Sequence, residues 1–212
     1  HGMAYNNLAI DEADLIIGLG MRFDDRVTGR ISAFAPNAKF VHIDIDASEV
    51  DKNIKTTVGM VGDLKLVLGQ LMPKIEPNVH IDWRRRINQL KVEHPSHLVR
   101  KSDELLPQYV LKRLTEVTQG WGIVVTGVGM HQMWAAQHCK FNEPNTFVTS
   151  GGLGTMGFEV PGALGAQIGR PDTTVWSVCG DGGFQMTMCD IATAVENHAE
   201  VKFAILNNNS LG

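Results

Sequence analysis

The stretch Thr174-Val175-Trp176-Ser177-Val178-Cys179-Gly180-Asp181-Gly182-Gly183 is an apolar, partly β-branched run that stops at a glycine-rich turn. Such a run predicts a buried strand. Further along, residues 190–198 have a helical pattern, and residues 201–206 form a second apolar run. A strand, a helix and a strand in this order are typical of parallel strands joined by a crossover helix. The stretch therefore predicts an α/β fold with a parallel sheet.

The same alternation extends over most of the chain. Strands are expected at residues 15–19, 40–45, 122–126 and 146–149, and helices at 105–117 and 157–169, with one more from the N-cap Asp63 to Pro73. We predict two doubly wound parallel-sheet units: residues 1–75 and residues 104–212. Residues 76–103 are predicted to be a linker that contains one helix across residues 83–93. Because His1 is no initiator methionine and Gly212 closely follows an apolar run, both units are expected to be incomplete.

Composition excludes several classes of protein. The 212 residues carry a formal net charge of −4, which argues against a general nucleic-acid binder. No apolar stretch approaches the length of about 20 residues that spans a bilayer, so no membrane role is predicted. The three cysteines, Cys139, Cys179 and Cys189, have neither disulfide-framework nor zinc-ligand spacing. Reduced thiols favour a cytoplasmic protein, or a plastid or mitochondrial one in a eukaryote.

Two polar motifs follow neighbouring strands of the predicted sheet. Asp181 comes directly after one strand, and Asn208 follows the next one. Carboxyl ends of parallel strands meet at one edge, where open α/β folds bind ligands. Carboxylate and amide oxygens suit Mg²⁺, and the glycines let backbone N–H groups approach a diphosphate. The alternative is that the glycine-rich segment is a simple turn and the asparagines a loop.

Taken together, Gly-Asp-Gly and the Asn-Asn about two dozen residues later resemble the signature of thiamin diphosphate enzymes. Over essentially the whole chain the sequence resembles the large catalytic subunit of the acetohydroxyacid synthase (acetolactate synthase) family. The segments that carry this resemblance are Arg22-Phe23-Asp24-Asp25-Arg26-Val27-Thr28-Gly29, residues 42–46 (HIDID), residues 129–136 (GMHQMWAA), residues 150–158 (SGGLGTMGF) and residues 180–208.

The resemblance implies how the cofactor is held. Asp181, Asn208 and Ser210 would bind Mg²⁺, the last through its carbonyl oxygen, and Met156 would support the bent cofactor and so act in catalysis. A satisfied histidine at position 131 and a gap-filling Met156 are the structural alternatives. The residues implied to contact thiamin diphosphate are Met130, His131, Gln132, Gly154, Thr155, Met156, Gly182, Gly183 and Asn208.

The amino-terminal unit resembles the part of the family's central domain that binds FAD. The implied FAD contacts are Gly20, Met21, Arg22, Phe23, Asp24, Asp44, Ile45, Asp63 and Leu64. Asp63 is explained equally well as an N-cap. Arg26 matches an arginine near the substrate channel, whose guanidinium suits the carboxylate of a 2-oxo acid. Its alternative is a surface ion pair with Asp24 or Asp25.

The reaction implied by the family is the decarboxylation of pyruvate and transfer of the two-carbon unit to pyruvate or 2-oxobutyrate, in isoleucine and valine biosynthesis. The family implies a dimer or tetramer with a possible regulatory small subunit, and a glutamate from a domain that precedes the central one. We therefore expect the 212-residue chain to be inactive by itself. Two other hypotheses are an assembly module that binds no cofactor and a nicotinamide-dependent oxidoreductase that uses Gly18-Leu19-Gly20.

Overall fold

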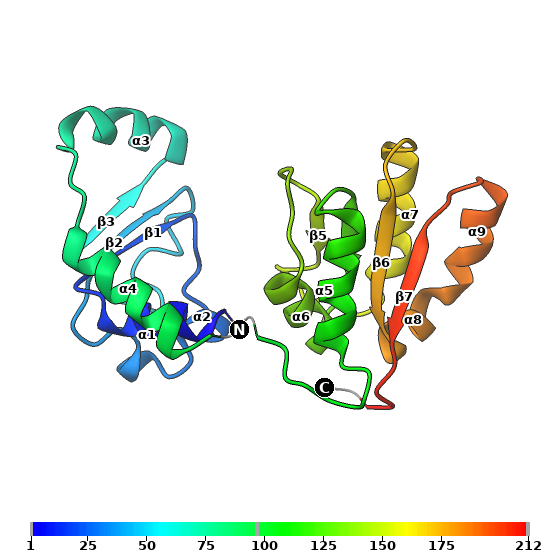
Figure 1. Ribbon diagram of the computed structural model, residues 1–212. Helices are drawn as coiled ribbons and strands as arrows, with labels where there is room; N and C mark the ends of the chain where they lie inside the picture. Colours follow the sequence, from blue (N-terminus) through cyan, green and yellow to red (C-terminus); the bar gives the residue numbers. More distant parts are fainter. Residues whose placement is uncertain (1, 96–97, 211–212) are drawn as a thin grey trace. The chain divides into compact units, whose positions relative to one another are not determined.

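The chain forms two compact units, His1–Ser96 and His97–Gly212. The structure, a computed structural model, describes residues 2–95 and 98–210. Each unit contains one parallel β-sheet with helices packed against it (Figure 1). The predicted α/β class with parallel sheets is thus confirmed. Within the described ranges, no helix has the length and apolar character that a membrane span requires.

The first unit has a three-stranded sheet with the strand order β1-β2-β3. Leu19 pairs with Ile43, and Asp44 pairs with Val61, so the three strands end at one edge. The elements are α1 (Ala4–Glu12), β1 (Leu15–Leu19), α2 (Asp25–Thr28), η1 (Ile31–Ala33), β2 (Lys39–Asp44), β3 (Val58–Val61), α3 (Leu64–Leu71), η2 (Met72–Lys74) and α4 (Ile81–Glu93). Of these, α1, α2, η1 and β3 have no counterpart among the predicted elements.

Aromatic side chains fill the core of the first unit. Phe23 is 3% exposed and packs edge-on against Phe34, Phe40 and His42, with ring centroids 5.1–6.3 Å apart. Edge-to-face packing of this kind is favourable beyond the area that it buries. The segment after β1 is therefore anchored by an aromatic side chain at its centre.

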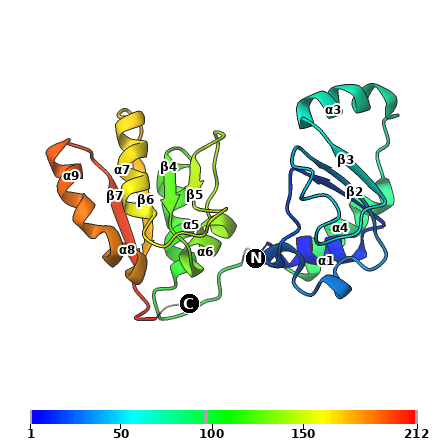
Figure 2. The ribbon, with the colours of Figure 1, turned by 180° about the vertical axis from the view of Figure 1, so that it is seen from behind.

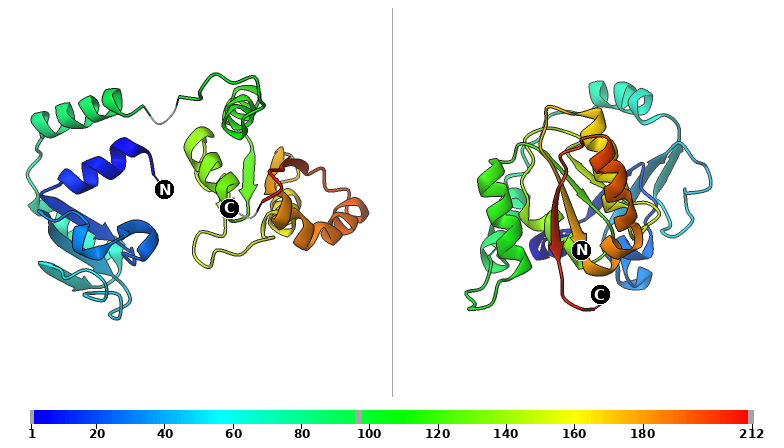
Figure 3. Two further views of the ribbon diagram at one scale, coloured as in Figure 1. Left: turned by 90° about the horizontal axis from the view of Figure 1, so that it is seen from below. Right: turned by 90° about the vertical axis from the view of Figure 1, so that its right-hand side faces the viewer.

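Helix α4 lies within the predicted linker but packs against α1, as Figure 3 shows. Arg86 on α4 donates two hydrogen bonds to the Glu12 carboxylate on α1, at 2.7 and 2.5 Å. Leu90 on the same helix is only 1% exposed. The first unit therefore extends beyond residue 75, and its division from the second lies between residues 96 and 97, which are outside the described residues.

The second unit has a four-stranded parallel sheet with the order β5-β4-β6-β7. The predicted strands are all present, with bounds shifted by one residue. The elements are α5 (Pro107–Thr118), β4 (Ile123–Thr126), α6 (Met130–His138), β5 (Phe147–Thr149), α7 (Glu159–Gly169), β6 (Val175–Gly180), α8 (Asp181–Thr187), η3 (Met188–Asp190), α9 (Ile191–Glu196) and β7 (Lys202–Leu206).

Helices cover both faces of this sheet (Figures 1 and 2). On one face, Leu111 and Leu114 of α5 and Ala135 of α6 pack against Val124 and Val178. On the other face, Ala163 of α7 packs against Ile123 and Val125 of β4 and Val175 of β6. The chain leaves β4 toward the first face and β6 toward the second. The carboxyl ends of β4 and β6 therefore form a topological switch point, where open α/β sheets bind ligands.

Candidate active site

A cavity of about 160 Å³ lies at this switch point. It is lined by the segments that follow β4, β6 and β7, together with Met156 from the loop before α7. The predicted site residues that line it are Met130, His131, Met156, Asp181, Gly182, Gly183, Asn208 and Ser210. The structure thus brings together residues that are up to 80 positions apart in the sequence.

Strand register explains why the two polar motifs meet. Gly180, the last residue of β6, pairs with Leu206, the last residue of β7. Asp181 then begins α8, while residues 207–210 form the loop after β7. Because the strands end at the same level, the Asp181 and Asn208 side chains line one cavity. The predicted parallel sheet is therefore sufficient to place Asp181 and Asn208 close together.

The donor set fits a hard divalent cation that shares its coordination with phosphate. Asp181 supplies one carboxylate, and Asn208 and Ser210 supply neutral oxygens. Asn208 Oδ1 accepts a hydrogen bond from the Ser210 N–H at 3.2 Å, which orders the loop. Among residues 2–95 and 98–210, no cluster of three or more His, Cys, Asp or Glu side chains could hold a metal ion. The set therefore suits Mg²⁺ only with ligands from a bound molecule.

His131 packs against the glycine-rich turn in the first turn of α6. Its side chain is 7% exposed, and its Nε2 has no hydrogen-bond partner among the described residues. Any Cβ atom at Gly180 would lie 3.0 Å from His131 Nδ1. Burial lowers the pKa of His131, and the Asp181 carboxylate offsets part of that shift. The imidazole is therefore neutral at pH 7.

Among the residues that the structure describes, those that line the cavity include a carboxylate but neither lysine nor arginine. A bound diphosphate would therefore gain no charge pairing from these side chains, and His131 is neutral. The diphosphate would instead be held by a divalent cation and by the backbone N–H groups of Gly182 and Gly183, which lie in the first turn of α8. A divalent cation beside Asp181 would supply the positive charge that these side chains lack.

Three predicted cofactor contacts do not line this cavity: Gln132, Gly154 and Thr155. The Gln132 side chain instead donates to Thr149 Oγ1 at 2.8 Å, and the Thr155 N–H donates to Ser150 Oγ at 3.0 Å. Conversely, Trp134 lines the cavity and is not among the predicted site residues. Its position four residues after Met130 on α6 is the signal that would have identified it.

In the first unit, the predicted FAD residues follow the carboxyl ends of the three strands: Gly20–Asp24 after β1, Asp44 and Ile45 at β2, and Asp63 and Leu64 after β3. Several of these side chains have structural partners. Phe23 is buried in the core, and the Asp63 carboxylate caps α3 by accepting from the Leu66 N–H at 3.0 Å. The N-cap interpretation of Asp63 is thus observed directly.

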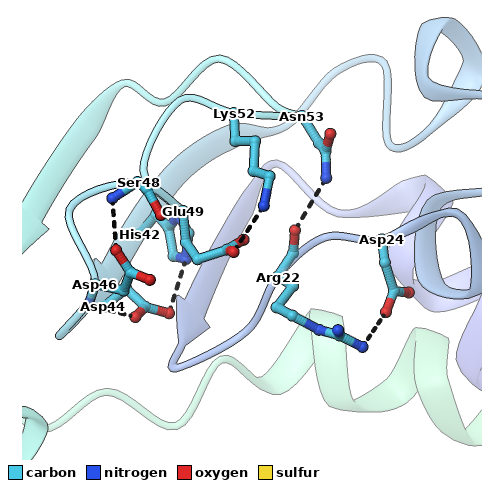
Figure 4. A network of polar contacts seen from close by, with 9 residues as sticks. All are labelled: Arg22, Asp24, His42, Asp44, Asp46, Ser48, Glu49, Lys52 and Asn53. Carbon is cyan, nitrogen blue, oxygen red and sulfur yellow. Dashed lines mark hydrogen bonds and ion pairs between the residues drawn. The ribbon is translucent and has the colours of Figure 1, made fainter. Parts of the chain in front are cut away.

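A polar network ties the loops at this edge together (Figure 4). Asn53 Nδ2 donates to the Arg22 carbonyl at 3.2 Å, which joins the loop after β2 to the loop after β1. Asp44 Oδ2 lies 3.8 Å from the buried His42 Nε2. The Asp46 N–H donates to Asp44 Oδ1 at 2.9 Å, which orders the backbone directly after β2.

Arg26 is exposed on the short helix α2. Its predicted structural alternative was an ion pair with Asp24 or Asp25, but the Asp24 carboxylate pairs with Arg22 at 2.9 Å. Asp24 also caps α2 by accepting from the Val27 N–H at 3.2 Å.

A doubly wound parallel sheet with a polar, glycine-rich cavity at its switch point is typical of the cofactor-binding domain of an α/β enzyme. Comparison with known proteins makes this class specific. Residues 127–212 match the thiamine pyrophosphate enzyme C-terminal TPP binding domain, and residues 1–71 match the thiamine pyrophosphate enzyme central domain. The chain belongs to the thiamine pyrophosphate enzyme family, in the acetolactate synthase group.

The curated relatives are acetolactate synthases. The chain is 45% identical to acetolactate synthase 1, chloroplastic, of Nicotiana tabacum, over all of this chain and 33% of that protein. It is 43% identical to the acetolactate synthase of Mycobacterium leprae and to the mitochondrial catalytic subunit of Saccharomyces cerevisiae, over 35% and 33% of their lengths. The chain thus spans about a third of these relatives. The nicotinamide alternative is not favoured.

Proposed function

We propose that this chain contributes to an acetolactate synthase, which decarboxylates pyruvate and transfers the two-carbon unit to a second 2-oxo acid in branched-chain amino acid biosynthesis. The observation that carries the proposal is the cavity at the switch point, whose lining has metal-ligand oxygens, glycine N–H groups and no side-chain cation. The similarity to acetolactate synthases over the whole chain supports the same reaction.

The residues present fit thiamin diphosphate with Mg²⁺. Asp181, Asn208 and the Ser210 carbonyl would hold the metal, and the Gly182 and Gly183 N–H groups would hold the diphosphate. When bound, thiamin diphosphate supplies the electron sink that the decarboxylation of a 2-oxo acid requires. The protein binds and orients this group, and Met156, which lines the cavity, would support its conformation.

We propose FAD as a second cofactor, held at the carboxyl edge of the first unit's sheet. The support is the alignment of Gly20–Asp24, Asp44–Ile45 and Asp63–Leu64 after three parallel strands. The ordered loops of Figure 4 would present backbone groups there. Side chains of Phe23 and Asp63 have structural partners, so we expect them to contribute through their backbone.

Substrates and partners follow from the same proposal. Pyruvate would be the donor, and pyruvate or 2-oxobutyrate the acceptor. Arg26 is exposed and would bind the acceptor's carboxylate through its guanidinium. A homodimer or tetramer and a regulatory small subunit are further expectations. The free cysteines are compatible with a reducing compartment such as the cytoplasm, a plastid or a mitochondrion.

Calorimetry with the 212-residue chain tests this proposal. We expect thiamin diphosphate to bind in the presence of Mg²⁺ and not in its absence, and Asp181→Ala to abolish binding. Asp172→Ala is the matched control, because Asp172 lies in the turn before β6, at the opposite end of that strand. Metal-independent binding, or equal binding by the two variants, would contradict the proposal. Absence of binding by the wild-type chain would instead favour the assembly-module hypothesis.

A further inference from the structure

Glu159 is a buried carboxylic acid that the proposed function does not use. It is the first residue of α7, and it is 0% exposed. Neither carboxyl oxygen has a hydrogen-bond partner among the described residues. A buried, unpartnered carboxyl group is costly, so its presence requires a reason.

The Glu159 carboxyl group occupies the space between two glycines. A Cβ atom at Gly127, directly after β4, would overlap Oε2, and a Cβ atom at Gly183, in the first turn of α8, would overlap Oε1. Gly183 itself is buried. The carboxyl group therefore separates the end of β4 from the first turn of α8, on the side of Gly183 that faces the protein interior.

Neighbouring contacts fix the position of Glu159. Ser177 Oγ on β6 donates to the Glu159 carbonyl at 2.9 Å, and both residues are fully buried. The α7 backbone at this point is therefore bonded to the sheet. Glu159 has no freedom to move its carboxyl group into solvent without displacing α7 or α8.

Burial also determines the charge of this group. Desolvation raises the pKa of Glu159, and the nearby N–H groups of Glu159 and Gly157 offset only part of the shift. A carboxylic acid in such surroundings is favoured in its uncharged form. A raised pKa reduces the negative charge beside the first turn of α8 and so reduces repulsion of an anion bound there.

We propose that Glu159 is a positioning residue, whose carboxyl group sets the spacing between Gly127 and Gly183 and thereby the position of the α8 N–H groups. This inference rests on the proposed function, because the N–H groups concerned are those assigned to the cofactor diphosphate. Glu159 acts through the backbone of α8, since it does not line the cavity.

Two substitutions test the proposal by calorimetric titration of thiamin diphosphate into the chain with saturating Mg²⁺. Glu159→Gln keeps the shape and cannot ionise, and we expect its Kd to stay within about threefold of the wild-type value. Glu159→Ala removes the spacer, and we expect at least about a tenfold loss, equivalent to 1.4 kcal/mol. Gln167→Ala on the same helix is the matched control. Gln167 is buried at the far end of α7, so this change lowers stability without lowering cofactor affinity.

A ligand-free double-mutant cycle tests the contact itself by urea unfolding. Gly183→Ala alone places a Cβ atom against Oε1, whereas Gly183→Ala combined with Glu159→Gly removes the overlap. We expect the double variant to lose less stability than the sum of the single losses. Additive losses would overturn the proposal, as would an unchanged Kd for Glu159→Ala or a Glu159→Gln variant as impaired as Glu159→Ala. If the cycle shows coupling but the wild-type chain binds no thiamin diphosphate, the proposed function is refuted and the spacing role of Glu159 is supported.

Discussion

Gln132 Nε2 donates a hydrogen bond of 2.8 Å to Thr149 Oγ1 and so joins the first turn of α6 to the end of β5. The same oxygen accepts from Thr126 Oγ1 at 2.9 Å, at the end of β4. The Thr149 hydroxyl can in turn donate to the Gly127 carbonyl at 3.5 Å. One hydroxyl group therefore joins the ends of β4 and β5 to the start of α6.

Replacing Thr149 by valine keeps the shape of the side chain but removes this hydroxyl. Because Thr126 Oγ1 is fully buried, it would lose its partner, and we expect the free energy of unfolding to fall by about 1–3 kcal/mol. Thr149→Ser keeps the hydroxyl and serves as the control. Urea unfolding of both variants measures the difference. A Thr149→Val variant as stable as Thr149→Ser would show that the network contributes nothing.

Helix α4 is expected to stabilise the first unit through its buried face. Leu90 is 1% exposed, so Leu90→Ala should lower the free energy of unfolding by about 2–5 kcal/mol. Val92 on the same helix is 81% exposed, and Val92→Ala should change it by less than about 0.5 kcal/mol. Hydrogen exchange should become faster in α1 in the first variant only. Unchanged α1 exchange in Leu90→Ala would contradict the docking of these two helices.

The three thiols should differ sharply in reactivity. Burial raises the pKa of Cys139 to about 11 and that of Cys179 to about 12, while Cys189 is exposed. At pH 8 only about one in a thousand Cys139 side chains is then a thiolate, the reactive form. A disulfide reagent should therefore label one thiol in the native chain and three in denaturant. Cys189→Ser should remove the native signal, and its persistence would refute this assignment.

Stability should also depend on pH through Glu159. Because its pKa is raised in the folded chain, its contribution is complete below the usual value of 4.5 and is lost as pH rises through the folded pKa. The titratable groups on the elements that pack against α7 are Cys179 on β6, Asp181 on α8, and Cys189 and Asp190 on η3. Cys179 stays neutral across this range. Urea unfolding from pH 4.5 to 8 measures the effect.

The matched variant for this pH dependence is Glu159→Gln, which cannot ionise. We expect the stability of the wild-type chain relative to Glu159→Gln to decrease as pH rises. A difference that is constant, or that increases with pH, would show that Glu159 is ionised in the folded chain.

Strand prediction succeeded where apolar runs were continuous. Residues 175–180 and 202–206 lie one position from the predicted strands, because buried parallel strands have an unbroken apolar pattern. The strand β3 was missed because its apolar run is only four residues long, Val58–Val61, and Gly59 interrupts it. The α4 helix was predicted, but its docking on α1 depends on contacts such as Arg86 with Glu12, 74 residues apart, which no local pattern encodes.

The sequence by itself determined the α/β class and placed Asp181 and Asn208 at one sheet edge, because both follow strands and parallel strands end together. It also identified the family, since the motifs are contiguous in the chain. Only the tertiary structure decided the lowered pKa of His131, the lack of lysine and arginine among the described residues that line the cavity, and the buried carboxyl group of Glu159 between Gly127 and Gly183. Desolvation and steric overlap arise from residues that are distant in sequence, so they exist only once the chain has packed.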